Sequence, residues 1–176
     1  MKLKFFVSAG IVLLLLAACN TATPEHSFDV AVLNANTLSR FGGKEIYEML
    51  KETPQTYDEK SKQMVQSSYV DHVKFKIMYA EKAYKDVQAL AETEETKPMI
   101  EASKDLFGYT VDKQKNGYLS IAAMKDAHVA DDSIQLAAVK FNELYQAAFS
   151  QKYDKLMELG KVYADKHNIK VQFHKF

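Results

Sequence analysis

Apolar residues recur at steps of three and four over long stretches of this chain, and this periodicity constrains its fold more than any other feature. The clearest stretch carries Val70, Val73, Ile77, Ala80, Tyr84, Val87 and Ala91, and its charged residues lie largely off that stripe. Such spacing places the apolar side chains on one face of an α-helix. A capping box at Thr56-x-x-Glu59 predicts that this helix starts near Thr56 and runs to Glu92.

The same reasoning predicts two further long helices. The first has Pro98 in its first turn and apolar positions from Ile100 to Ala122, with a kink or break at Asn116-Gly117. The second carries apolar residues from Ile134 to Tyr163, with Asp132 as its N-terminal cap and Asn168 as its C-terminal cap.

The N-terminal part of the domain predicts a helix that is interrupted. Phe28, Val32, Ala35 and Leu38 have helical spacing, Gly42-Gly43 breaks the pattern, and Ile46, Met49 and Leu50 form a second short face. The tail from Ile169 to Phe173 alternates and predicts a short extended segment laid on the helices. Short turns join these segments, so the predicted fold is all-α: an antiparallel helical bundle of three long helices plus a broken N-terminal helix.

The composition excludes several classes of protein. Of the 176 residues, 47% are apolar, which rules out disorder over the whole length. A single cysteine cannot form an intramolecular disulfide. The 23 basic residues balance the 23 acidic residues, which argues against nucleic-acid binding through a general basic field.

The first residues have the pattern of a secretory signal. Lys2 and Lys4 precede an apolar run from Phe5 to Ala18, which as a helix would span only about 21 Å, too short for a bilayer. A charged start followed by a short apolar run predicts a signal peptide that is cleaved.

The run ends in Leu16-Ala17-Ala18-Cys19, which resembles the lipobox of bacterial lipoproteins. The resemblance implies that the Cys19 thiol receives a diacylglyceryl group and that cleavage leaves Cys19 as the new N-terminus, bound to a membrane by its acyl chains. Asn20 stands where an Asp would indicate inner-membrane retention, so in a Gram-negative host the outer membrane is favoured. The alternative is an ordinary secretory signal, or a simple transmembrane start, in which Cys19 is not lipidated.

This interpretation divides the chain into a signal peptide at 1–18, a lipidated tether at 19–27 and a helical bundle domain with a short tail at 28–176. Removal of Lys2 and Lys4 with the signal leaves 21 basic against 23 acidic residues, so the mature form is slightly acidic. With Cys19 lipidated, no thiol remains for a metal site.

Three sets of residues are candidates for chemistry. Glu45, Glu48 and Glu52 share one predicted helical face, a geometry that suits a metal or a general acid/base pair. Lys44 and Lys51 stand beside Glu48, which favours a solvated charged face instead.

The five histidines offer weak ligand sets. His128 lies near Asp131 and Asp132, but Asp132 is already assigned as a helix cap. A non-covalent haem would need one His and one Met, for example His72 with Met64 or Met78, whereas Met at helical spacing is more often core filler.

The tyrosines are the third set. Tyrosine is favoured at interfaces and at the edges of a core, and the edge role is the more common one. An exposed groove lined by tyrosines would be a partner site. The set comprises Tyr69, Tyr79, Tyr84, Tyr145, Tyr153 and Tyr163.

The sequence contains neither a Gly-rich phosphate loop nor a Gly-x-Ser-x-Gly elbow. We therefore expect a membrane-anchored envelope lipoprotein that acts as a binding or scaffolding helical bundle, with a protein partner in the envelope, no cofactor, no nucleic acid and no enzymatic activity. Cys19 is the one residue assigned a role. One alternative is a periplasmic or surface bundle that binds a small ligand such as a metal or haem, through His72 or His128. A further alternative is an enzyme such as a hydrolase of envelope polymers, which would need a deep cleft with convergent acids and histidines.

Overall fold

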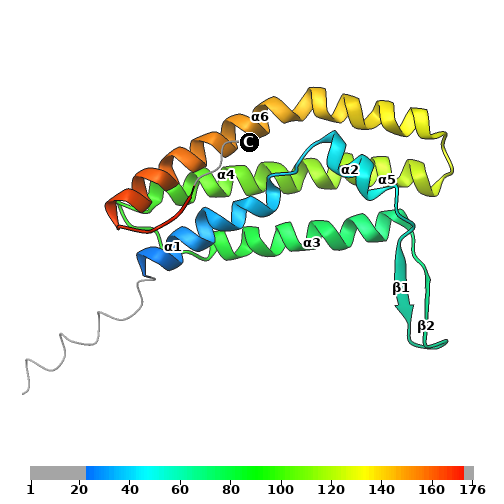
Figure 1. Ribbon diagram of the computed structural model, residues 1–176, viewed down its shortest axis with the longest axis horizontal. Coiled ribbons are helices and arrows are strands. Elements are labelled where there is room, and N and C mark those ends of the chain that lie inside the picture. Colours follow the sequence, from blue (N-terminus) through cyan, green and yellow to red (C-terminus); the bar gives the residue numbers. More distant parts are fainter. Residues whose placement is uncertain (1–22, 173–176) are drawn as a thin grey trace, which may run out of the picture.

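The computed structural model describes residues 23–172, and most of them lie in helices (Figure 1). The predicted signal peptide, Cys19, Phe173 and His174 lie outside the described residues. In chain order the elements are α1 (Pro24–Ala31), the 3₁₀-helix η2 (Leu33–Leu38), α2 (Gly43–Met49), β1 (Gln55–Asp58), β2 (Gln63–Gln66), α3 (Tyr69–Gln88), α4 (Lys97–Lys113), the π-helix η3 (Gln114–Tyr118), α5 (Leu119–Asp126) and α6 (Asp131–Lys166).

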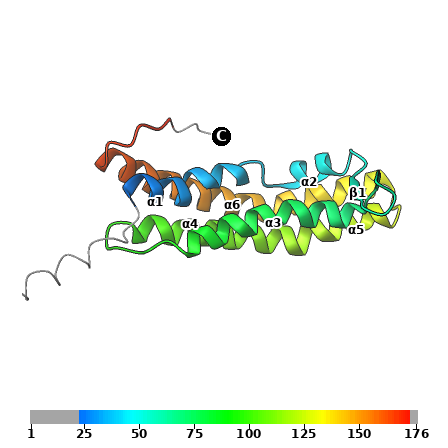
Figure 2. The same ribbon diagram turned by 90° about the horizontal axis from the view of Figure 1, so that it is seen from below.

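Three long helical segments form the bundle. These are α3, the continuous segment α4–η3–α5, and α6, whose 36 residues extend about 54 Å. Helices α3 and α6 both pack against α4, and the chain reverses between successive segments (Figures 1 and 2). The structure confirms the predicted all-α antiparallel bundle, with a small two-stranded hairpin as the exception.

The first segment is broken, as predicted, and it packs across the long helices. Helix α1 contacts α3, α4 and α6, and it begins at Pro24, within the segment expected to be a tether. Thr23 caps it by accepting the His26 N–H at 3.2 Å. The chain then tightens into η2, because the buried residues Val32, Ala35 and Leu38 recur at steps of three, the period of a 3₁₀-helix rather than an α-helix.

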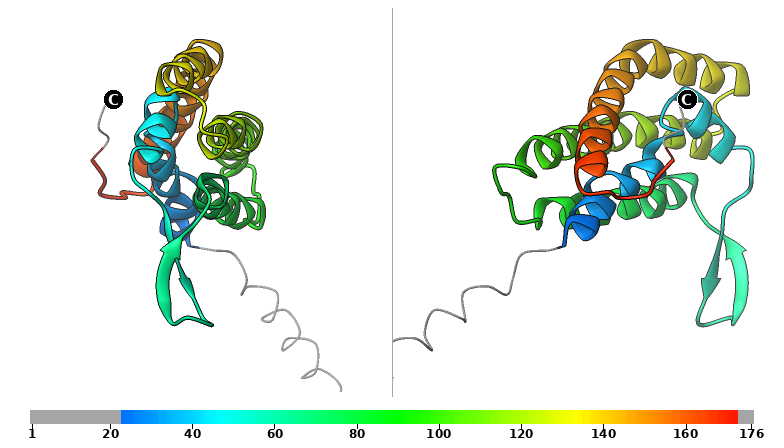
Figure 3. Two further views of the ribbon diagram at one scale, coloured as in Figure 1. Left: turned by 90° about the vertical axis from the view of Figure 1, so that its right-hand side faces the viewer. Right: turned by 60° about the vertical axis from the view of Figure 1, so that its left-hand side comes forward.

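The predicted helix start at Thr56 is wrong. Residues 55–58 pair antiparallel with residues 63–66, and this hairpin projects from one end of the bundle (Figure 3). The Asp58 carboxylate accepts the N–H groups of Lys60 and Ser61 and closes the turn. The helix begins only at Tyr69, one residue before the apolar stripe, and Ser68 caps it by accepting the Asp71 N–H at 3.0 Å.

The predicted break at Asn116-Gly117 is a π-helix inside one continuous helical segment. Gly117 is required there, because a Cβ at this position would approach the Phe141 ring on α6 to 2.3 Å. The wider π turn points both Gln114 and Tyr118 into the protein, where they are buried.

The two ends of α6 give one correction and one confirmation. Ala130, and not Asp132, is the N-terminal cap, and Asp132 lies in the first turn, where its charge complements the helix dipole. Asn168 terminates the helix as predicted. It adopts a positive φ of 55°, and the Ile169 N–H donates to the Ala164 carbonyl, the geometry of a Schellman motif.

Candidate functional site

A fully buried tyrosine in the π-helix connects the long helices to the broken N-terminal segment. The Tyr118 hydroxyl accepts the Gly42 N–H at 2.8 Å. It also lies 2.9 Å from the Gly42 carbonyl oxygen and 2.8 Å from Glu45 Oε2. A hydroxyl has one proton, so Tyr118 donates to only one of these two oxygens at a time.

Two glycines bring α2 close enough to make these contacts. Gly42 has a φ of 145°, a conformation that favours glycine. Gly43 packs against the backbone of α6, where a Cβ would approach the Ala138 carbonyl oxygen to 1.9 Å. Its N–H donates to Asn142 Oδ1 at 3.2 Å, which fixes the start of α2 against α6.

This docking draws the Glu45 carboxyl partly out of solvent. Burial raises the pKa of Glu45 above its ordinary value of 4.5, opposed by the hydrogen bond from Tyr118 and by the charges of Arg40 and Lys76. Burial, followed by the nearby charge of Glu45, also raises the pKa of Tyr118 far above its ordinary value. The phenol therefore stays protonated at physiological pH.

Glu45 and Tyr118 line a cavity of about 310 Å³ between η2, α2, α3 and the π-helix, a volume at the lower end for small-molecule sites. Most of its wall is apolar. The lining residues are Thr37, Leu38, Glu45, Met49, Lys76, Ile77, Tyr79, Ala80, Ala83, Gln114 and Tyr118.

Gln114, one of the lining residues, carries a side-chain oxygen that is closed off from solvent and has no partner among the described residues. Gln114 is 8% exposed, and its Oε1 atom makes no hydrogen bond within the part of the chain that the structure describes. Leaving such an acceptor unsatisfied costs about 1–3 kcal/mol. Gln146 Oε1, next to Gly42, is likewise unpartnered, but Gln146 does not line the cavity.

An aromatic cluster holds the π-helix in place. The Tyr118 ring stacks on Phe41 at 6.0 Å and meets Phe141 at 5.0 Å between centroids. Phe41 in turn stacks on Phe149 at 4.7 Å. These buried rings pack around Tyr118 and set the position of its hydroxyl at the cavity wall.

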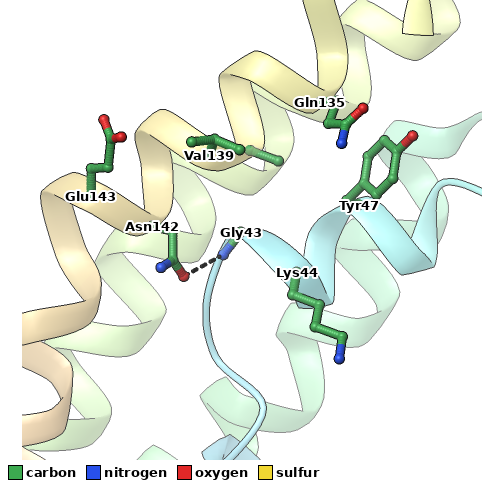
Figure 4. A pocket seen from close by; sticks show the side chains of 8 residues that line it. Gly43, Lys44, Tyr47, Gln135, Val139, Asn142 and Glu143 are labelled. Atoms are coloured by element: carbon green, nitrogen blue, oxygen red, sulfur yellow. Dashed lines mark hydrogen bonds between the residues drawn. The ribbon is translucent and has the colours of Figure 1, made fainter. Parts of the chain in front are cut away.

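A second hollow of about 350 Å³ lies on the other side of α2, against α6 (Figure 4). Its wall includes Tyr47, Ala138 and Val139. The Asn142 amide oxygen is occupied by the Gly43 N–H, and the side chains of Lys44 and Glu143 extend away from each other (Figure 4). This hollow presents mainly apolar surface, so the Glu45 cavity carries more chemistry.

The structure separates the three predicted glutamates. Glu45 turns into the cavity, Glu48 pairs with Lys51 at 2.8 Å, and α2 ends at Met49, before Glu52. The Lys51 partner confirms the charged-face interpretation for Glu48, and the pKa of Glu48 is lowered chiefly by that hydrogen bond. The same interpretation is wrong for Glu45.

The histidine hypotheses gain no geometric support. His128 has a positive φ of 55° and occupies a Schellman turn, in which the Val129 N–H donates to the Met124 carbonyl at 3.0 Å. Asp131 pairs with Lys125 at 2.7 Å. No group of three potential metal ligands occurs within residues 23–172.

The proposed haem ligands beside His72 are not core residues. Met64 lies in the hairpin and Met78 on α3, and both side chains are exposed. The interpretation of these two methionines as core filler is therefore wrong.

Most of the tyrosines singled out from the sequence lie at the edge of the core or within it. Tyr153 and Tyr163 are buried, and Tyr69, Tyr84 and Tyr145 are partly buried against the core. Tyr79 is exposed and packs edge-on against Phe75 at 5.1 Å. The edge role is confirmed for Tyr69, Tyr84 and Tyr145, and it is wrong for Tyr153 and Tyr163, which belong to the core.

Sequence reasoning missed Gln114 and Tyr118. Their spacing of four residues indicates that they share one face of a helix. It does not indicate that this face is buried, because the π-turn that directs both side chains inward has no distinct sequence pattern.

Comparison with protein families, with curated proteins and with solved structures found no match for this chain. Within the described residues, none of the helices is both long enough and apolar enough to cross a bilayer.

Proposed function

We propose that this chain is a lipid-anchored binding protein of a bacterial cell envelope and that its bundle holds a small ligand in the Glu45 cavity. The cavity itself is the single observation that carries the binding role, because its volume of about 310 Å³ and its mainly apolar wall with one partly buried carboxyl suit a small molecule. The proposed role is binding and not catalysis.

The lipobox supports the anchor. Cys19 stands five residues before Pro24, so with about 3.8 Å per residue the α1 end of the bundle lies within about 19 Å of the anchor. The hairpin lies at the opposite end of the bundle (Figure 1). Two or three acyl chains hold a protein on a membrane far more firmly than one. In a Gram-negative host we propose the outer membrane.

The anchor is tested with Cys19→Ser in the native host. Wild-type protein is expected in the membrane fraction, with an intact mass that exceeds the chain 19–176 by its acyl groups. The Cys19→Ser variant is expected to lose both properties, and Ser8→Ala, which leaves the lipobox intact, is expected to keep them. Unmodified wild-type protein, or unchanged membrane partition of the variant, contradicts the anchor.

The cavity is tested by filling it. Ala83 lines the cavity from α3, so Ala83→Phe occupies its volume, whereas Ala147→Phe adds the same ring to an exposed position on α6. Protein purified from its host in detergent is denatured, and the released small molecules are identified by mass spectrometry. A molecule released by the wild type and by Ala147→Phe, but not by Ala83→Phe, is expected. Identical release from the wild type and Ala83→Phe contradicts the proposal.

Protein binding is a second candidate function, favoured by the hairpin. Tyr57 and Met64 pair across its strands, and both are more than half exposed. An isolated two-stranded hairpin is only marginally stable, so a partner would add stabilising contacts. A photocrosslinker at Tyr57 is expected to capture an envelope protein that a crosslinker at Lys140, exposed on α6, does not. Equal capture at the two positions contradicts this role.

A further inference from the structure

The hollow between α2 and α6 offers mainly apolar surface to whatever enters it. Tyr47, Ala138 and Val139 line it (Figure 4). The Asn142 amide oxygen, which also lies in its wall, already accepts the Gly43 N–H at 3.2 Å. A small polar ligand would therefore find few groups to orient it, whereas an apolar side chain would fit.

The apolar surface continues beside the hollow on α6. Leu136 and Val139 are three residues apart, so their side chains lie on the same side of the helix. They are 54% and 47% exposed. Exposed apolar side chains that gather beside a hollow mark an interaction surface. We call this surface the α2–α6 face, and it comprises Lys44, Tyr47, Leu136, Ala138, Val139 and Glu143.

The α2–α6 face carries one cation and one anion on opposite sides. Lys44 comes from α2 and Glu143 from α6, and both side chains are exposed (Figure 4). Within residues 23–172 neither side chain forms an ion pair. Glu48 feels the charge of Lys44 only weakly, because its hydrogen bond from Lys51 dominates. Both charges are therefore available to a partner.

This distribution makes the face complementary to a copy of itself. When two copies pair about a two-fold axis, every contact between them occurs twice. Lys44 of each copy then faces the partner's Glu143, and the apolar side chains of the two copies meet between these charged contacts. A partner of a single charge sign would be attracted at one side of the face and repelled at the other.

We propose that the α2–α6 face binds a second copy of this chain as a two-fold dimer. The apolar contacts supply most of the stability, and Lys44 and Glu143 determine which surfaces pair, because exposed ion pairs contribute little energy but like charges are repelled. The inference does not depend on a ligand in the Glu45 cavity, since no residue lines both sites.

Charge reversal tests the pairing. Full-length protein is purified in detergent, and native mass spectrometry measures the dimer fraction over a range of protein concentrations. The wild type is expected to dimerise. Lys44→Glu and Glu143→Lys are each expected to weaken dimerisation about ten-fold or more, because each replaces two attractive contacts with two repulsive ones. Lys82→Glu reverses an exposed charge on α3 and is expected to have no effect.

Recombining the reversed charges separates an effect between copies from an effect within one copy. The double variant Lys44→Glu/Glu143→Lys is expected to dimerise as the wild type does. In a mixture of the two single variants, one of them isotope-labelled, both contacts of the heterodimer join opposite charges and both contacts of each homodimer join like charges. Heterodimers are therefore expected to exceed either homodimer.

The apolar part of the face is tested separately. Val139→Glu places a charge among the apolar side chains and is expected to abolish dimerisation. Val139 is half-exposed, so the fold is expected to persist, and a two-dimensional amide spectrum of the variant verifies this.

Photocrosslinking in the native host tests the same face in the cell. A crosslinker at Leu136 is expected to give a product of twice the mass of the chain. A crosslinker at Val162 is expected not to, because Val162 is 65% exposed but lies about 40 Å further along α6.

Three results would overturn the proposal. The first is a wild type that stays monomeric, and the second is a pair of single reversals that leave dimerisation unchanged or give no excess of heterodimer on mixing. The third is capture of a different protein at Leu136 without any product of twice the mass, which would exclude a second copy as the occupant.

Discussion

Removing the Tyr118 hydroxyl is the sharpest test of the hydrogen bonds that join Gly42 and Glu45 to the π-helix. Tyr118→Phe keeps the ring stacked on Phe41 and deletes only the oxygen, so the aromatic cluster is preserved. The deletion leaves the buried Gly42 N–H without its acceptor, at a cost of about 1–3 kcal/mol. It also removes the 2.8 Å hydrogen bond to Glu45, which water replaces in part because Glu45 is only partly buried.

We therefore expect Tyr118→Phe to lower the free energy of unfolding by about 2–4 kcal/mol. The free energies of unfolding are measured by urea denaturation at neutral pH, followed by far-UV circular dichroism. The variant and the wild type are compared on the condition that their m-values agree. Tyr79→Phe is the matched control, because Tyr79 lines the same cavity but is 57% exposed, and we expect it to stay within about 0.5 kcal/mol of the wild type. A Tyr118→Phe change no larger than that of the control refutes the proposed hydrogen-bond network.

Three other perturbations test the surroundings of the site. Burial raises the pKa of Glu45, so the folded state binds the Glu45 carboxyl proton more tightly than the unfolded chain does. Protonation of Glu45 therefore stabilises the folded state below about pH 4.5, and this stabilisation is lost as the pH rises through the folded-state pKa. Urea unfolding should therefore show Glu45→Gln gaining stability relative to the wild type as the pH rises through this window; a constant difference would contradict this. Gly43→Ala places a Cβ 1.9 Å from a backbone oxygen of α6 and should lower the stability by about 1–3 kcal/mol or more, whereas Gly108→Ala meets only the end of a flexible tyrosine at 3.0 Å and should be neutral or stabilising in thermal unfolding. Equal effects of the two glycine substitutions would argue against the close approach of α2 to α6. The Asp126 carboxylate accepts two free N–H groups at the start of α3, at 2.8 and 3.0 Å, so Asp126→Ala should cost about 1–2 kcal/mol in the same assay, and Asp86→Ala, on the exposed face of α3, should cost less than half as much.

The fold could be predicted from the sequence where one periodicity dominates. The stripe through Val73, Ile77 and Val87 is buried as expected, because an amphipathic helix has only one way to remove that stripe from water. The hairpin could not be predicted from the same pattern. Its residues are exposed, so no buried stripe indicates how the two strands pair. Thr56 and Glu59 match the pattern of a helix N-terminus, whereas in the structure Asp58 closes a turn.

The candidate site was only partly predictable. The sequence placed Glu45 on an acidic face, but its inward direction depends on how closely Gly43 packs against Ala138, a long-range contact. The inward direction of Gln114 and Tyr118 depends on a π-turn whose Gly117 fits against Phe141. Contacts between distant segments decide these orientations, and local spacing does not encode them.

The central claim is that α2 and the π-helix hold the Glu45 carboxyl at the wall of a cavity, partly out of water. The most direct measurement is an NMR titration of the Glu45 carboxyl carbon in the folded protein. We expect a pKa above the ordinary value of 4.5, because burial disfavours the charged carboxylate. A pKa at or below 4.5 would contradict the claim.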